Sequence, residues 1–125
     1  METLHLHLIS DATGETIGNL TRACLAQFPD VEPNEHPWNL VRTEKDINKV
    51  IKGIEKNPGM VLYTLVNRKF QNRLEKSCLS LGVPCVSALD PIFAAMSKFF
   101  GLKSQEKPGH QHVMDAEYFH RLEAM

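Results

Sequence analysis

The chain has 125 residues, of which 42% are hydrophobic and 23% are charged, and its formal net charge is −1. This length suits one compact domain, and the balanced charge gives no signal for nucleic acid or for a membrane surface. The three cysteines are odd in number and lack C-x-x-C spacing, which argues against a disulfide framework and a zinc ribbon. Without an apolar stretch long enough to span a bilayer or a basic leader, we expect a cytoplasmic protein.

The first predicted strand, Leu4 to Ile9, alternates leucines with His5 and His7. The two histidines lie on one strand face, but no Cys or Glu ligands accompany them at a familiar spacing, so we expect no metal site. We interpret them as covering one face of a sheet, with hydrogen bonds to neighbouring helices.

A polar turn follows this strand at once, and a helix predicted over Glu15 to Phe28 follows the turn. Two interpretations stay open. In the first, Asp11 or Thr13 merely caps the helix. In the second, hydroxyl and backbone N–H groups bind a phosphate at the positive end of the helix, and Asp11 acts as a general base or helps to hold a metal ion. The phosphate-binding candidates in this turn are Ser10, Thr13, Gly14 and Thr16.

The next elements alternate in the same way. Pro29 ends the first helix, and the proline-containing connection after it leads to a weaker strand predicted over Trp38 to Arg42. Thr43 is a candidate cap for a helix with Ile47, Val50, Ile51 and Ile54 at helical spacing. The apolar segment Met60 to Val66 predicts a strand covered on both faces.

The last predicted units follow the same pattern. A third helix starts at Asn67 or Arg68 and ends at Gly82 as a C-cap. Val83 to Leu89 predicts the fourth strand, and Asp90 is a candidate cap of a final helix with Pro91 in its first turn.

These repeats predict an α/β fold, a four-stranded parallel Rossmann-like sheet in the order 2-1-3-4 with helices on both faces. Ligands bind such sheets beyond the carboxyl ends of the strands, where the order switches. We expect this crevice to be lined by the Ser10 to Gly14 turn, Asn67 and Arg68, Arg42 and Thr43, and Asp90. Arg42 could clamp a phosphate there with its guanidinium group.

The polarity of the chain changes after Phe100. We predict an α/β domain over residues 1–102 and, over residues 103–125, a linker and a connecting helix. His110 and His112 lie in this linker and could approach an active site, although an exposed loop would also explain them.

Several motifs of this chain are similar to those of one family. SDATGET at Ser10 to Thr16, HPWNLVRT at His36 to Thr43, NPGMVLYTLV at Asn57 to Val66 and GVPCVSALDPI at Gly82 to Ile92 resemble the pyruvate, phosphate dikinase/phosphoenolpyruvate synthase regulatory proteins. The final segment from Pro108 to Met125 resembles the same family. The matches keep their order over nearly the whole chain.

The resemblance implies a bifunctional enzyme that uses ADP to phosphorylate a threonine of the target dikinase or synthase. It also implies removal of that phosphate by inorganic phosphate, with release of pyrophosphate. ADP, inorganic phosphate and Mg²⁺ are therefore the expected small molecules, and phosphoenolpyruvate synthase or pyruvate, phosphate dikinase is the expected partner.

One departure from the family pattern bears on activity. Family members are longer, and no G-x-x-x-x-G-K-[ST] phosphate loop occurs in this sequence. We therefore expect the chain to be the amino-terminal portion of such an enzyme and to be inactive alone. The alternatives are a non-catalytic phosphate- or nucleotide-binding module, or a module for homodimer formation and docking to the target.

Overall fold

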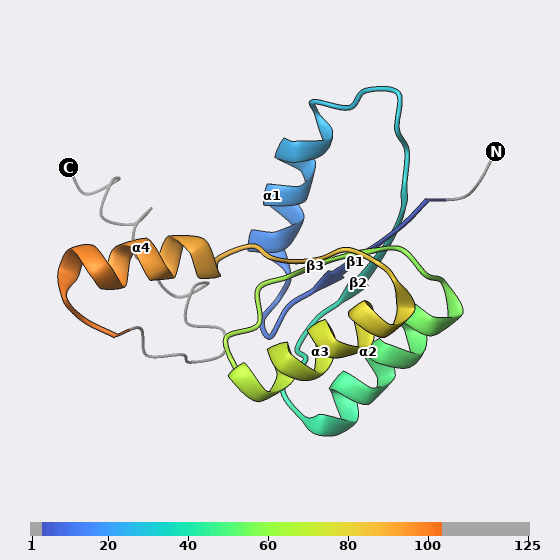
Figure 1. Cartoon of the computed structure of the whole chain (residues 1–125). Coiled ribbons are helices and arrows are strands. Elements are labelled where there is room, and N and C mark those ends of the chain that lie inside the picture. Colours follow the sequence, from blue (N-terminus) through green and yellow to red (C-terminus); the bar gives the residue numbers. More distant parts are fainter. Residues whose placement is uncertain (1–3, 104–125) are drawn as a thin grey trace.

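The computed structural model describes residues 4–103, in which four strands alternate with four helices (Figure 1). The sheet is entirely parallel, and its order is β2-β1-β3-β4. The predicted Rossmann-like sheet order is therefore confirmed. In chain order the elements are β1 (His5–Ile9), α1 (Glu15–Leu25), β2 (Asn34–Trp38), α2 (Glu44–Lys56), β3 (Met60–Tyr63), α3 (Arg68–Leu81), β4 (Cys85–Ser87) and α4 (Asp90–Phe100).

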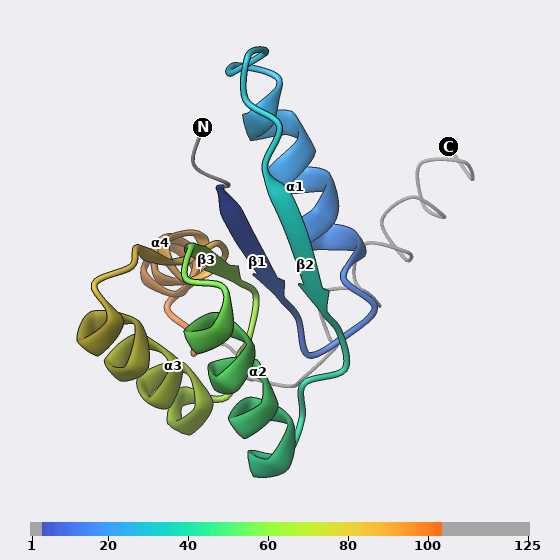
Figure 2. The same ribbon diagram turned by 90° about the vertical axis from the view of Figure 1, so that its right-hand side faces the viewer.

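Helices cover both faces of this sheet, α1 on one side and α2 with α3 on the other (Figures 1 and 2). Alternate strand residues point to opposite faces, so each face has its own apolar layer. Toward α2 and α3 the larger core contains Ile9, Val61 and Tyr63. Toward α1 a smaller core is built around Leu6, Leu8 and Ile17.

The fourth helix differs from the other three, because none of its residues is buried. Figure 1 shows α4 extending away from the sheet rather than lying across it. Its exposed side chains include Ile92, Met96, Phe99 and Phe100. This helix therefore presents apolar surface that the rest of the described chain does not cover.

The position of β2 corrects the predicted strand at Trp38 to Arg42. The strand is Asn34–Trp38, and it contains Pro37. Because β2 lies at the edge of the sheet and pairs only with β1, it can contain a proline whose missing N–H is on the unpaired side of the strand. After Trp38 the chain leaves the sheet, and Leu40 has a positive φ of 56°.

Several predicted boundaries were too long. α1 ends at Leu25 rather than Phe28, and Phe28 is exposed. α1 buries Ile17, Gly18 and Thr21, whereas Leu20 and Cys24 are exposed. β3 stops at Tyr63, and β4 spans only three residues.

The helix ends test the predicted caps. Thr43 caps α2 in a reciprocal capping box with Asp46, and Gly82 ends α3 in the left-handed conformation, so both predictions are confirmed. The predicted cap at Asp90 was wrong, because Leu89 is the N-cap residue and Asp90 is the first residue of α4.

Candidate functional site

The turn from Ser10 to Gly14 is fixed at the carboxyl end of β1 by main-chain hydrogen bonds. Ser10 donates its N–H to the Trp38 carbonyl over 2.8 Å, and Val41 donates its N–H to the Ser10 carbonyl over 3.0 Å. Leu40 donates its N–H to the Ala12 carbonyl over 2.9 Å. The turn after β1 is therefore held to the segment that follows β2.

The predicted hydroxyl groups of this turn have different surroundings. Ser10 is buried, and its Oγ accepts a hydrogen bond from the Ala12 N–H over 2.9 Å. Thr13 is exposed, and Thr16 is partly exposed in the first turn of α1. Thr13 is thus accessible to a ligand, whereas the Ser10 hydroxyl shapes the turn.

Asp11 joins three parts of the structure. Its side chain is only 2% exposed, and its Oδ2 accepts the N–H of Val66 over 3.1 Å. Its carbonyl oxygen accepts the Nε–H of Arg42 over 2.7 Å. The predicted approach of Asp11 and Arg42 is thereby confirmed.

The structure does not support the capping interpretation of the turn. The N-cap residue of α1 is Gly14, which has a φ of 87° and no side chain that could cap the helix. Neither Asp11 nor Thr13 therefore occupies the N-cap position. A side chain at position 14 would be strained in this left-handed conformation and would also overlap Asn39.

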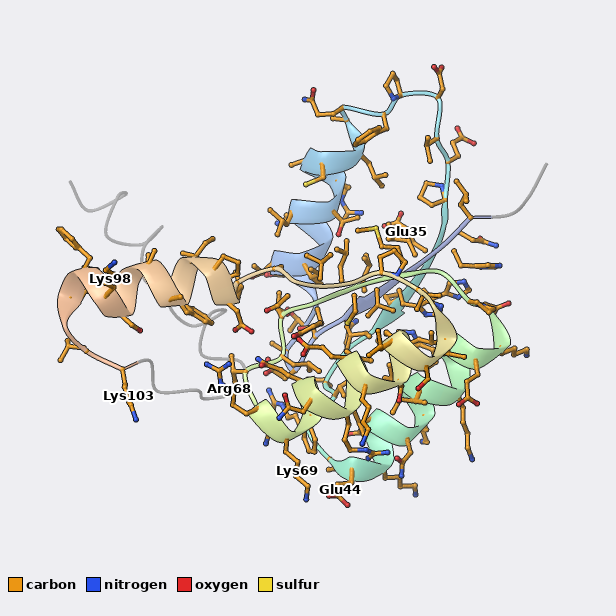
Figure 3. All side chains as sticks on the ribbon, in the orientation of Figure 1. Glu35, Glu44, Arg68, Lys69, Lys98 and Lys103 are labelled. Carbon is orange, nitrogen blue, oxygen red and sulfur yellow. The ribbon has the colours of Figure 1, made fainter. Side chains whose placement is uncertain are left out.

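The other predicted site residues mainly support helix starts. Thr43 accepts the Asp46 N–H through its hydroxyl over 3.1 Å, as part of the α2 cap. Asn67 caps α3, since its Oδ1 accepts the Phe70 N–H over 3.1 Å. Arg68 is exposed at the start of α3 (Figure 3). His110 and His112 lie outside the described residues.

Thr64 is a candidate that the sequence analysis missed. It follows β3 directly, and its N–H donates to the Ile9 carbonyl over 3.0 Å, next to the Ser10 turn. Its side chain is 2% exposed, yet its hydroxyl has no hydrogen-bond partner among the described residues. Buried hydroxyl groups normally find a partner. A polar residue at the carboxyl end of an apolar strand was the signal that could have identified it.

A cavity of about 250 Å³ lies on the β2 side of the same turn. Thr13 and Gly14 line it together with Arg22 of α1, Glu35 of β2 and Asn39. Figure 3 shows Glu35 in a different part of the molecule from Arg68. The turn thus borders this cavity on one side, while Asp11 faces the β3–α3 connection through Val66.

The histidines lie nearer the other end of the sheet. His7 is fully buried, its Nε2 is 2.8 Å from the Asn57 carbonyl oxygen, and its Nδ1 is 3.1 Å from Trp38 Nε1. His5 Nδ1 lies 2.9 Å from His36 Nε2, and the ring of His36 stacks on His7. The predicted contact with a helix holds for His7, because Asn57 is the C-cap residue of α2, whereas His5 contacts His36 of β2 instead.

Burial and contacts change the acidity of two core groups. Burial, together with the nearby His36 and His5, lowers the pKa of His7, and the hydrogen bond to Asn57 opposes this shift only in part. Burial and the hydrogen bond to Glu75 raise the pKa of Tyr63. We expect both side chains to be neutral near pH 7.

The architecture defines the class of this protein: an open parallel α/β domain of Rossmann-like form, with polar groups gathered at the carboxyl ends of its central strands. Comparison with known proteins is more specific. The model of the Kinase/pyrophosphorylase family matches residues 6–125, and the chain belongs to this family.

Two relatives are longer than this chain, which matches only part of each. A protein of Paramagnetospirillum magneticum is 50% identical over 125 residues, which are 100% of this chain and 40% of the relative. A protein of Rhodospirillum rubrum is 44% identical over the same length, or 46% of that relative. Both are provisionally named pyruvate, phosphate dikinase regulatory proteins. The chain spans less than half the length of either relative.

Within residues 4–103, no helix combines the length and the hydropathy needed to cross a bilayer.

Proposed function

We propose that this chain is the amino-terminal domain of a bifunctional kinase and pyrophosphorylase that regulates pyruvate, phosphate dikinase or phosphoenolpyruvate synthase. The single observation that carries the proposal is the match of the Kinase/pyrophosphorylase model to residues 6–125. The names of the relatives support the dikinase as the target. In this proposal ADP donates the phosphoryl group to the target threonine. In the opposite reaction, inorganic phosphate removes this group and pyrophosphate is released.

We assign the target threonine to the region at the carboxyl ends of β1 and β3. The carboxylate of Asp11 accepts a hydrogen bond from the β3–α3 connection, at the Val66 N–H. The main-chain carbonyl of Asp11 accepts a second hydrogen bond, from Arg42. A carboxylate in this position can orient a hydroxyl group or accept its proton. Arg42 brings positive charge to the same place, where phosphate charge would develop.

We do not assign the nucleotide to this domain. The sequence has no phosphate loop with a lysine, and phosphoryl transfer needs a preorganised set of charges around the nucleotide. ADP and any Mg²⁺ bound to it would then be held mainly by a part of the protein that these 125 residues do not include. The domain would contribute the groups that position the threonine.

A chimeric enzyme tests this proposal. The chain would replace the matching 40% of the P. magneticum relative, and the chimera would be incubated with ADP, Mg²⁺ and a purified dikinase or synthase. We expect phosphothreonine on the target and its removal by inorganic phosphate with release of pyrophosphate. The isolated chain should give neither product. A folded chimera without either activity, beside an active relative, would contradict the proposal.

The exposed face of α4 favours a second candidate, in which the domain also forms a homodimer. Phe99 is 87% exposed and lies beside other exposed apolar residues of the same helix. The molar mass of the chain in solution tests this, with Phe99→Ser as the variant. Leu79→Ser is the matched control, because Leu79 is 82% exposed on α3. A monomeric wild-type chain would exclude the dimer.

A further inference from the structure

The outer surface of α2 and α3 carries an excess of positive charge. Together the two helices contain eight lysine or arginine residues against four aspartate or glutamate residues, a net charge of +4, although the whole chain has a net charge of −1. On α2 the exposed Lys49, Lys52 and Lys56 recur at helical spacing, so they lie on one side of the helix. Arg73 and Lys76 extend this charge onto α3, which lies beside α2 (Figures 1 and 2). We call these five residues the basic face.

Most acidic groups of the two helices already have partners. Glu44 forms an ion pair with Lys69 over 2.6 Å, the Asp46 carboxylate closes the capping box of α2, and Glu75 accepts a hydrogen bond from Tyr63. Within residues 4–103, no lysine of the basic face forms an ion pair. The charge of this face is therefore available to another molecule.

The basic face adjoins the candidate site. α2 begins at Glu44, two residues after Arg42, and α3 begins at Arg68, two residues after Val66. Arg42 and Val66 both donate hydrogen bonds to Asp11. The two helices thus start beside Asp11, and their first residues lie together in Figure 3. A protein bound with its threonine at Asp11 would also cover part of these helices.

We propose that the basic face docks an acidic surface of the target protein, next to the threonine that is modified. This inference rests on the proposed function, because it takes the ligand of the Asp11 region to be a protein. Complementary charges speed the encounter of two proteins and fix their relative orientation. The other side of the molecule would repel the same acidic surface, since residues 15–38, which include α1 and β2, contain four acidic residues and only one arginine.

A nucleic acid fits this face less well than an acidic protein. Binding of single strands commonly uses exposed aromatic side chains on which bases stack. The only aromatic residue of α2 and α3 is Phe70, and it is buried. The face offers positive charge without a stacking surface.

Binding is measured separately from catalysis, so that this proposal and the proposed function can fail independently. The 125-residue chain carries a fluorophore on Cys24, the exposed cysteine of α1, and its anisotropy is recorded with purified pyruvate, phosphate dikinase. We expect binding at low salt that weakens as the ionic strength rises. The pair Lys49→Glu with Lys52→Glu should weaken binding at low salt by about tenfold or more, and the same pair changed to glutamine should give a smaller loss.

The matched control is Lys98→Glu with Lys103→Glu. It changes the net charge by the same amount at α4 and just after it, away from α2 and α3 (Figure 3), and we expect it to bind as the wild type does. Melting curves establish that every variant is folded. In the chimera, the Lys49 and Lys52 reversals should raise KM for the dikinase and leave kcat unchanged, and high salt should remove the difference.

Three outcomes would overturn the proposal. The first is no binding of the dikinase by the folded wild-type chain. The second is an equal loss in the basic-face pair and in the control pair. The third is salt-sensitive self-association of the chain that the basic-face pair abolishes, because the face would then belong to a second copy. Variant-sensitive binding beside an inactive chimera would support the docking face and contradict only the proposed function.

Discussion

The Nε–H of Arg42 donates a hydrogen bond to the carbonyl oxygen of Asp11 over 2.7 Å, across 31 positions of sequence. This bond connects the segment after β2 to the turn after β1, at the carboxyl ends of two neighbouring strands. The carboxylate of the same Asp11 accepts the N–H of Val66 on the other side. One residue therefore links the ends of β1, β2 and β3.

Replacing Arg42 should loosen this connection. We expect Arg42→Gln to lower the free energy of unfolding by about 1 kcal/mol, the usual net contribution of one hydrogen bond. Urea denaturation of both proteins measures the difference. Lys45→Gln is the matched control, because Lys45 is an exposed cation at the start of α2, and we expect almost no change there. Equal losses in the two variants would mean that charge, rather than the bond to Asp11, matters.

Asp11→Asn tests the assigned role of the carboxylate. In the chimera we expect phosphorylation and phosphorolysis to fall together by about two to four orders of magnitude, the usual contribution of a general base. Asparagine retains an oxygen that can accept the Val66 N–H, so the thermal melt should change little. The measurements are the rates of both reactions beside a melting curve. Glu35→Gln, at the cavity on the other side of the turn, is the control, and unchanged rates in Asp11→Asn would remove Asp11 from catalysis.

Two glycines inside helices should respond in opposite ways to alanine. A Cβ atom at Gly53 would overlap the indole ring of Trp38, whereas one at Gly18 would meet only the flexible end of Arg22, at 3.1 Å. We expect Gly53→Ala to lose about 1 kcal/mol or more, because overpacking exceeds the gain in helix propensity. Gly18→Ala should be neutral or gain up to about 1 kcal/mol. Urea denaturation of the pair checks this, and a stabilised Gly53→Ala would show that α2 can move away from β2.

His7 should make stability depend on pH. Its two ring nitrogens contact a carbonyl oxygen and an indole N–H, which fits only the neutral ring with the proton on Nε2. Because burial lowers its pKa in the folded state, the unfolded chain binds a proton first as the pH falls below about 6.5. The free energy of unfolding should therefore decrease on acidification, by at most about 1.4 kcal/mol per pH unit, down to the folded-state pKa.

The comparison with His7→Gln isolates this contribution from those of the other histidines. We expect the variant to lose less stability than the wild type between neutral pH and about pH 5. Urea denaturation at a series of pH values gives both curves. Parallel curves would show that the ionisation of His7 is not linked to folding.

The sequence predicted the sheet order well because β1 and β3 have strong apolar patterns and are each followed by a helix. It misplaced β2 for a physical reason. The strand Asn34–Trp38 is at the sheet edge and is largely polar, so its pattern is weaker than that of the apolar residues just after it. Val41 is buried by its contacts with the larger core although it is outside the strand.

For the candidate site, the sequence placed Asp11 and Arg42 at the same end of the sheet, because carboxyl ends of parallel strands share one edge. It could not identify Val66 as the donor to Asp11, since that contact spans 55 positions. It predicted Thr43 both as the cap of α2 and as a crevice residue, and the structure confirms the cap. Local patterns predict the order of strands and helices, but the ends of the strands and the partner of each polar group depend on packing.

Pro37 has a consequence for how the molecule meets other molecules. Asn34 donates to the Leu4 carbonyl and Trp38 accepts from Ser10, so these alternate residues of β2 bond to β1. In a parallel ladder the intervening residues direct their amide groups outward, and Pro37 therefore removes an N–H from the open side of β2. An incoming strand would find an incomplete set of donors there, which protects the edge against uncontrolled β-sheet aggregation.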